Sequence, residues 1–235
     1  MASIQIAPPH RSGIRGLWHS TIGKKVVVAV TGLIMIAWLL VHMLGNLKIF
    51  FGPTEFDDYA HWLREIGTPI LKGAWFLWIQ RAVLLVVLLL HIVASVQLSW
   101  RDLRARPVKY TGRQRFEATV TTRYMRTGGI ALGLFIVWHL LNLSAGVGIE
   151  GYDQPRAYAN IAQNFSVWWE NVIYIAAMVA LGLHIHHGFE SSTRTLGFHR
   201  PTRARVIKRS GDVLAVVIAG GFIVVPVAVM IGLVD

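Results

Sequence analysis

This chain of 235 residues contains no cysteine and few charged residues, and its 12 acidic residues are outnumbered by 23 basic ones. The absence of cysteine excludes thiolate metal ligands. Charged residues make up 15% of the chain and hydrophobic residues 54%, which is typical of a membrane protein and not of a soluble globule. The bilayer is therefore the expected solvent of this protein.

Five apolar stretches are long enough to cross a bilayer as helices, which needs about twenty residues each. They cover residues 25–47, 75–98, 124–147, 167–190 and 212–234. The longest connecting segments leave no room for a separate soluble domain. The sequence therefore predicts an all-α integral membrane protein, a bundle of five transmembrane helices forming one membrane-anchor domain over 1–235.

Lysine and arginine are distributed by side of the membrane. Seventeen of them lie before the first stretch, between the second and third, or between the fourth and fifth. These segments share one side, so the positive-inside rule predicts a cytoplasmic N-terminus. The expected location is a bacterial cytoplasmic (inner) membrane. Membrane lipid headgroups and an acidic protein partner both suit this basic face, and the net charge of +11 does not indicate nucleic acid.

The first outer loop contains a helical pattern of apolar residues. Phe56, Tyr59, Leu63 and Ile66 recur at intervals of three and four residues. This spacing predicts a short amphipathic helix lying on the outer membrane surface.

Each of the first four apolar stretches contains a histidine well inside it. These are His42, His91, His139 and His184, at spacings of 49, 48 and 45 residues. One such histidine is readily explained by a hydrogen bond to a neighbouring helix. Four at regular spacing indicate a shared role, and bis-histidine ligation of haem iron is the simplest one. No carboxylate or thiol lies near them in sequence, so a zinc site is less suited.

Alternating helix direction pairs these histidines by depth. With a rise of about 1.5 Å per residue, His42 and His139 lie about 25 Å from the inner ends of their helices. His91 and His184 each precede an inner arginine by ten residues. An outer haem between His42 and His139 is therefore expected, with an inner haem between His91 and His184. His187, on the same helical face as His184, is the alternative inner ligand.

The first stretch also carries a motif, Thr31-Gly32-Leu33 followed about ten residues later by His42-Met43-Leu44-Gly45-Asn46. With Gly23-Lys24-Lys25 before it and Phe51-Gly52 after it, this motif resembles the signature of the cytochrome b558 family of succinate dehydrogenase membrane anchors. That family is related to the dihaem fumarate reductase anchors. The resemblance covers the whole chain, including five spans and a histidine in each of the first four.

The resemblance implies the non-catalytic anchor and electron-transfer subunit of succinate dehydrogenase, a succinate:quinone oxidoreductase. Its partners would be a flavoprotein subunit with FAD and an iron–sulfur subunit on the cytoplasmic face, compatible with a higher oligomer of the whole complex. Its cofactors would be two haem b groups, with quinone as substrate and menaquinone favoured over ubiquinone. His42 and His139 would hold the distal haem, and His91 and His184 the proximal one. Succinate chemistry would belong to the partners.

Haem propionates and a quinone would need polar partners near the membrane surfaces. Arg81 is an outer candidate, although snorkelling to the headgroups explains it equally well. Arg123 and Arg126 are inner candidates for propionates. His19 and Ser20, just before the first stretch, are candidates for a quinone carbonyl, although an interfacial anchor is the simpler explanation.

Departures and alternatives accompany this interpretation. Some dihaem relatives have a glutamate two residues before the fourth-span ligand, where this chain has Gly182. Glu170, Glu190 and Asp212 all lie at the ends of stretches, so no carboxylate proton relay is expected.

Two other functions remain open. One is a cytochrome b subunit of another membrane oxidoreductase, such as a hydrogenase or formate dehydrogenase. The other is a transporter or haem-free structural anchor.

Overall fold

The structure, a computed structural model, describes residues 14–70, 73–105, 115–198 and 200–235. Within these ranges the chain forms helices and turns and no β-strand. Five helices are long and apolar enough to span a membrane, which confirms the predicted all-α, five-helix fold and is typical of a multi-pass membrane protein. They are α2 (Thr21–Leu47), α4 (Trp75–Arg104), α5 (Arg115–His139), α7 (Trp168–Thr195) and α8 (Ala204–Met230).

Five shorter elements lie at the ends of these helices. They are α1 (Ile14–His19), the 3-10 helix η1 (Lys48–Phe51), α3 (Pro53–Glu65), the π-helical turn η2 (Leu140–Ser144) and α6 (Ala157–Phe165). Of these, α3 is the helix expected in the first outer loop, with Phe56 buried and Tyr59, Leu63 and Ile66 half-buried. Its position on a membrane surface stays a prediction. Helices α1 and α6 were not expected from the sequence.

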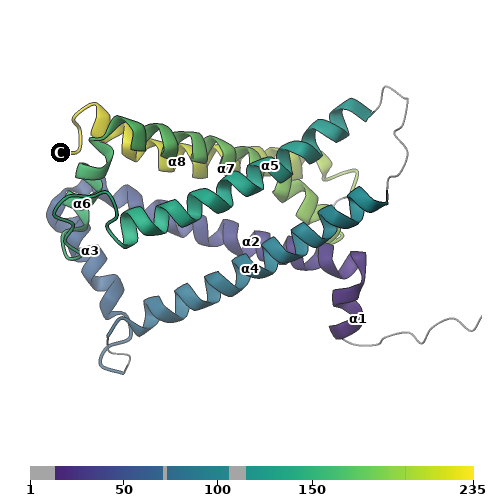
Figure 1. Ribbon diagram of the computed structural model, residues 1–235, viewed down its shortest axis with the longest axis horizontal. Helices are drawn as coiled ribbons and strands as arrows, with labels where there is room; N and C mark the ends of the chain where they lie inside the picture. Colours follow the sequence, from purple (N-terminus) through teal and green to yellow (C-terminus); the bar gives the residue numbers. More distant parts are fainter. Residues whose placement is uncertain (1–13, 71–72, 106–114, 199) are drawn as a thin grey trace, which may run out of the picture.

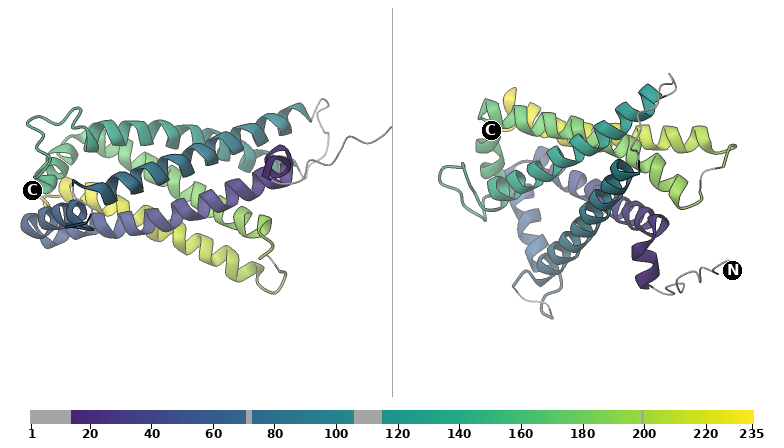
Figure 2. Two further views of the ribbon diagram at one scale, coloured as in Figure 1. Left: turned by 90° about the horizontal axis from the view of Figure 1, so that it is seen from below. Right: turned by 45° about the vertical axis from the view of Figure 1, so that its right-hand side comes forward.

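The long helices run along one axis and leave two unlike ends (Figure 1). One end holds η1, α3, η2, α6 and the C-terminus, and is called the capped end here. The opposite end holds α1, the last turns of α4 and α7 and the first turns of α5 and α8 (Figure 2). This second end, called the basic end, carries the arginines and lysines of those turns. Which end faces the cytoplasm remains a prediction from the distribution of charge.

Helix packing arranges four of the long helices around a common centre. α2 packs against α4 on one side and α7 on the other, and α5 packs against α7. As a result, α2 lies diagonally across from α5, and α4 lies diagonally across from α7. α8 packs against α7 and α2 from outside this group, where Ile218 is fully buried beside Ile185 and Ala215.

The helices extend beyond the apolar stretches at the basic end. α4 continues to Arg104, α5 begins at Arg115, and α8 begins at Ala204, although the fifth apolar stretch was placed over 212–234. Arginine, lysine and leucine are good helix formers, so the helices do not stop where the hydrocarbon ends. At the other end α8 stops at Met230, and Gly232 turns the chain with a φ of 73°.

The capped end is held together by contacts between α3 and α6. Asp57 Oδ1 of α3 accepts a hydrogen bond of 2.8 Å from the backbone N–H of Tyr158, in the first turn of α6. The rings of Phe56 and Tyr158 are 6.5 Å apart, edge to face. Both rings belong to a buried cluster that also takes in Phe165 and Tyr174. Thus two short helices from different loops form a packed layer over this end of the bundle.

Two adjacent glycines of α8 have very different surroundings. A Cβ atom at Gly221 would overlap the side chain of Met43 in α2, and Met43 is only 2% exposed. A Cβ atom at Gly220 would meet nothing within 4 Å. Gly221 therefore allows α8 and α2 to approach closely.

We expect Gly221→Ala to destabilise the protein by about 1–3 kcal/mol, because it forces Met43 to move within a packed interface. Gly220→Ala is the matched control, and its gain in helix propensity should leave stability unchanged or raise it by up to about 1 kcal/mol. Thermal unfolding of both variants in the same detergent measures the difference. Equal midpoints for the two variants would contradict the predicted close contact.

Candidate functional site

Two histidine pairs lie between the helices in the centre of the bundle at different levels, and all four side chains are half-buried. His42 of α2 and His139, the last residue of α5, form the capped-end pair, with ring centres 6.1 Å apart and planes at 78°. His91 of α4 and His184 of α7 form the basic-end pair, with ring centres 6.4 Å apart and planes at 62°. Each pair joins helices that lie diagonally across the bundle. These are the two pairs expected from depth.

The spacing within each pair suits a metal ion between the rings. With metal–nitrogen bonds of about 2 Å, two imidazoles facing each other across a metal ion have ring centres about 6 Å apart. Aromatic rings in direct edge-to-face contact have centres at about 4.5–7 Å, so the distance is also compatible with two rings in contact. A second observation favours an absent group: His184 Nδ1 is buried and has no hydrogen-bond partner among the described residues.

Glycines face the rings of the basic-end pair. A Cβ atom at Gly32 of α2 would lie 3.4 Å from His91 Cε1, and one at Gly129 of α5 would lie 3.7 Å from His184 Cε1. Each ring therefore packs against a helix surface that has no side chain.

Aromatic rings surround the capped-end pair instead. Trp38 stacks on His42 with ring centres 4.6 Å apart and planes at 15°, and Phe222 lies 5.6 Å from the same ring. Phe135 lies 5.8 Å from His139. These contacts restrict rotation of both imidazoles.

His184 and the alternative ligand His187 have different neighbours. The ring that faces His91 is that of His184, whereas His187 contacts His186 at 4.6 Å between ring centres. His186 in turn lies with Nδ1 2.6 Å from Asp212 Oδ1 of α8. These three polar residues lie nearer the basic end and belong to the packing of α7 against α8.

A carboxyl group is buried beside the capped-end pair. Glu170, the third residue of α7, is 2% exposed. It accepts hydrogen bonds from Trp138 Nε1 at 3.1 Å and from Asn142 Nδ2 at 3.4 Å. No lysine or arginine in the described part of the chain forms an ion pair with it. From the sequence, Glu170 was expected at the end of a helix, but its burial was not expected.

Asn142 links this carboxyl group to His139. It is fully buried in η2, and its amide donates to Val147 O at 3.0 Å and to Asn164 Oδ1 at 2.9 Å. Its side-chain oxygen accepts from the Tyr174 hydroxyl at 2.8 Å, and that hydroxyl lies 3.5 Å from His139 Nδ1. π-helical turns such as η2 are uncommon and recur at functional sites.

The arginines proposed for cofactor binding differ in their surroundings. Arg81 is exposed, and its guanidinium lies 5.0 Å from the centre of the Trp78 ring. Arg126 bridges α5 to α4 through Asp102 at 3.7 Å, and its Nε is buried without a hydrogen-bond partner among the described residues. Arg126 precedes Gly129 by three residues and shares its helical face, which points to His184. The backbone of Arg123 lies in α5, and its side chain lies outside the described residues.

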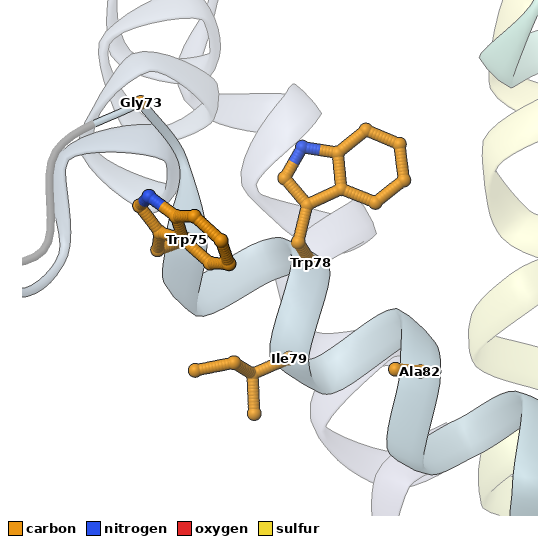
Figure 3. A pocket seen from close by; sticks show the side chains of 5 residues that line it. All are labelled: Gly73, Trp75, Trp78, Ile79 and Ala82. Atoms are coloured by element: carbon orange, nitrogen blue, oxygen red, sulfur yellow. The ribbon is translucent and has the colours of Figure 1, made fainter.

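Arg81 lies beside a shallow apolar depression of about 580 Å³ at the start of α4. Trp75, Trp78, Ile79 and Ala82 line it together with Gly73, and Figure 3 shows both indole rings standing out from the helix. None of the four paired histidines lines this depression. An interfacial position of Arg81 among aromatic residues agrees with the snorkelling explanation.

His19 and Ser20 lie where α1 meets α2. Ser20 is the N-cap of α2, and its hydroxyl oxygen accepts a hydrogen bond of 2.8 Å from the backbone N–H of Gly23. His19 is exposed, and its carbonyl oxygen accepts from Arg101 Nη2 at 3.0 Å. These contacts fix the start of α2 and give both residues a structural role.

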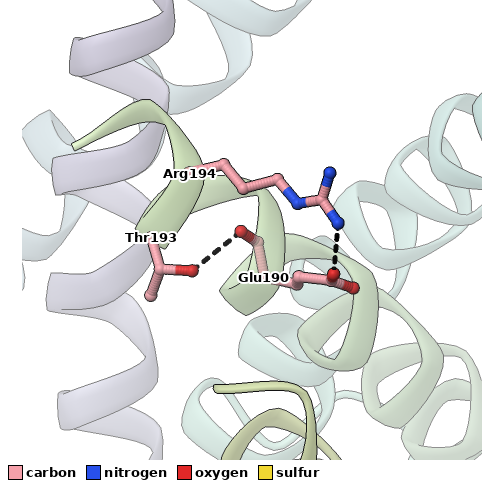
Figure 4. A network of polar contacts seen from close by, with 3 residues as sticks. All are labelled: Glu190, Thr193 and Arg194. Atoms are coloured by element: carbon pink, nitrogen blue, oxygen red, sulfur yellow. Dashed lines mark hydrogen bonds and ion pairs between the residues drawn. The ribbon is translucent and has the colours of Figure 1, made fainter. Parts of the chain in front are cut away.

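The basic end also contains an ion pair within α7. Arg194 Nη2 lies 2.6 Å from Glu190 Oε1, and the Thr193 hydroxyl donates to the backbone oxygen of Glu190 at 2.8 Å (Figure 4). Glu190 is therefore engaged with its own helix at the surface, in contrast to the buried Glu170.

Fold and site together define a class: over the described residues, an all-helical protein with five membrane-length helices and two half-buried histidine pairs at different levels. Comparison with protein-family models, with curated proteins and with solved structures found no match to this chain. Its function is therefore inferred from the geometry of the two pairs and from the sequence around them.

We expect Glu170→Ala to destabilise the capped end by about 1–3 kcal/mol, because the buried Trp138 N–H loses its acceptor. Glu170→Gln keeps a side-chain oxygen for Trp138, and Asn142 retains Val147 O and Asn164 Oδ1 as acceptors, so it should cost much less. Thermal unfolding in detergent compares the two variants. If Gln and Ala are equally destabilising, the hydrogen bond from Trp138 is not what Glu170 contributes.

Proposed function

We propose that this chain is the dihaem cytochrome b membrane-anchor subunit of a succinate:quinone oxidoreductase. The observation that carries the proposal is that two histidine pairs lie at two levels of one bundle. Their ring centres are 6.1 Å apart in one pair and 6.4 Å apart in the other. The motif around His42 supports the particular complex.

In this proposal each histidine pair would hold one haem b iron. The haems, when bound, would supply one-electron carriers between the partner's iron–sulfur clusters and a membrane quinone. The chain's own residues position the ligands: diagonal helices bring the two rings of a pair to one level, and neighbouring side chains and glycines contact the rings. A dry, apolar surrounding and the contacts of the ligand rings tune the reduction potential of a haem.

Residues near the two ends would contact the polar edges of the cofactors. Arg126 is the best supported of these, because its buried Nε has no hydrogen-bond partner in the described structure and its helical face leads to Gly129 beside His184. A propionate carboxylate is a natural acceptor for a buried guanidinium. Arg123 and Arg81 remain candidates, with Arg81 at the membrane interface. His19 and Ser20 remain candidates for a quinone contact.

The basic end is the proposed docking face for the flavoprotein and iron–sulfur subunits. Positive residues of α4, α5, α7 and α8 gather there, which suits an acidic partner surface and predicts a cytoplasmic orientation in a bacterial inner membrane. Succinate oxidation would take place in those partners, and this chain would pass their electrons to or from quinone, with menaquinone favoured over ubiquinone.

Haem stoichiometry of single histidine variants tests the proposal. We expect the purified wild-type chain to show a dithionite-reducible b-type spectrum and two haems per chain. His139→Ala should lose the capped-end haem and keep the other, whereas His91→Ala should lose only the basic-end haem, because each iron loses one of its two axial ligands. Pyridine haemochrome analysis measures the ratio.

His187→Ala is the matched control, since it removes a histidine one turn from His184 that does not face His91. It should retain both haems. A wild-type protein without a b-type spectrum would leave a haem-free anchor as the remaining function. Loss of both haems from every variant would contradict two independent sites. Copurification with flavoprotein and iron–sulfur subunits distinguishes the succinate complex from a hydrogenase or formate dehydrogenase.

A further inference from the structure

The Thr31-Gly32 pair of α2 has no role in the proposal above, although it directly contacts one of the paired histidines. Thr31 is 5% exposed, and its hydroxyl oxygen lies 3.0 Å from His91 Nδ1 of α4. Gly32, the next residue, lies against the edge of the same imidazole ring formed by Cε1 and Nδ1. Resting on the proposed function, we infer that Thr31 is a positioning residue that presents His91 Nε2 to the haem iron.

The direction of this hydrogen bond follows from counting protons. The backbone of Val28 is a second hydrogen-bond partner of His91, and a carbonyl oxygen there can only accept from the ring. The Thr31 hydroxyl has one hydrogen, and its oxygen lies 2.6 Å from Val27 O and 3.2 Å from Val28 O, both in its own helix. A carbonyl oxygen can only accept, so the short contact to Val27 O takes the hydroxyl proton. The threonine oxygen then offers only lone pairs to His91, and His91 Nδ1 must be the donor.

This direction fixes the tautomer of the imidazole. A neutral histidine carries one ring proton, so a proton on Nδ1 leaves Nε2 with a free lone pair. Nε2 is then the nitrogen available to a metal ion, and the hydrogen bond at Nδ1 sets the orientation of the ring and raises its basicity as a ligand.

Gly32 explains how the threonine can reach the ring. A Cβ atom at Gly32 would already lie 3.4 Å from His91 Cε1 and 3.8 Å from Nδ1, so a larger side chain there would occupy the space that the ring fills. Thr31 thus provides a hydrogen-bond acceptor for His91, and Gly32 provides a helix surface without a side chain against which the imidazole ring packs.

His184 and His139 have no equivalent short hydrogen bond at Nδ1 within the described residues. His184 Nδ1 has no hydrogen-bond partner among the described residues, and His139 Nδ1 is 3.5 Å from the Tyr174 hydroxyl, at the outer limit for a hydrogen bond. The basic-end pair is therefore held from one side, through His91. Removing the Thr31 hydroxyl should affect the basic-end haem selectively.

Thr31→Val, measured in the intact purified complex, tests this inference. Valine matches the shape of threonine but cannot accept a hydrogen bond, so His91 keeps only the backbone oxygen of Val28 as an acceptor and becomes a weaker electron donor to iron. We expect the midpoint potential of the basic-end haem to shift to a more positive value and its low-spin electron paramagnetic resonance signal to move. The capped-end haem should keep its potential and signal. Thr31→Ser should restore the wild-type values because it retains the hydroxyl group.

Thr193→Val serves as the matched control. It also removes a helix hydroxyl that bonds a backbone oxygen of its own helix, at Glu190, and it should shift neither potential. Unchanged potentials and signals in Thr31→Val, with two haems in the wild type, overturn the inference and leave the proposed function intact. A wild-type complex without haem overturns both. Should the valine variant not accumulate, Thr31→Ala removes the same acceptor and is measured in the same way.

Discussion

The pairing of imidazoles across the diagonals of the bundle is the constraint on which the rest of the structure depends. In each pair an imidazole ring of one helix faces an imidazole ring of the diagonally opposite helix, with ring centres 6.1 Å and 6.4 Å apart. Since α2 packs on α4 and α7, and α5 on α7, the four rings all point to the centre. Helix register is thereby fixed, because sliding any of these helices by one turn would separate both the rings and the packed surfaces.

The two pairs occupy very different surroundings within the same bundle. Stacked aromatic rings and a buried network around Asn142 enclose the capped-end pair, whereas glycine surfaces and one hydroxyl group contact the basic-end pair. Hydrogen bonding at the ligand ring and local polarity are the main means by which a protein sets the potential of a bound metal centre. Identical ligand types at both levels therefore need not give identical redox behaviour.

The sequence was sufficient to predict the helices and the pairing of levels. A long apolar segment satisfies its backbone in lipid only as a helix, and a constant rise per residue then gives the depth of each histidine. It did not predict α6 or the burial of Glu170, because hydropathy along a chain does not reveal which face meets a neighbour. His184 and His187 share a helical face, so only the position of α4 in the structure distinguishes them.

The diagonal arrangement also has a consequence for biosynthesis. During translation His42, His91 and His139 all leave the ribosome before His184 is made. Because α7 packs on both α2 and α5, which do not pack on each other, the helices that carry the capped-end pair are held together only once α7 has been made. The basic-end pair is completed by the same helix. α8 carries no member of either pair and is made last, and its Gly221 packs onto Met43 beside His42.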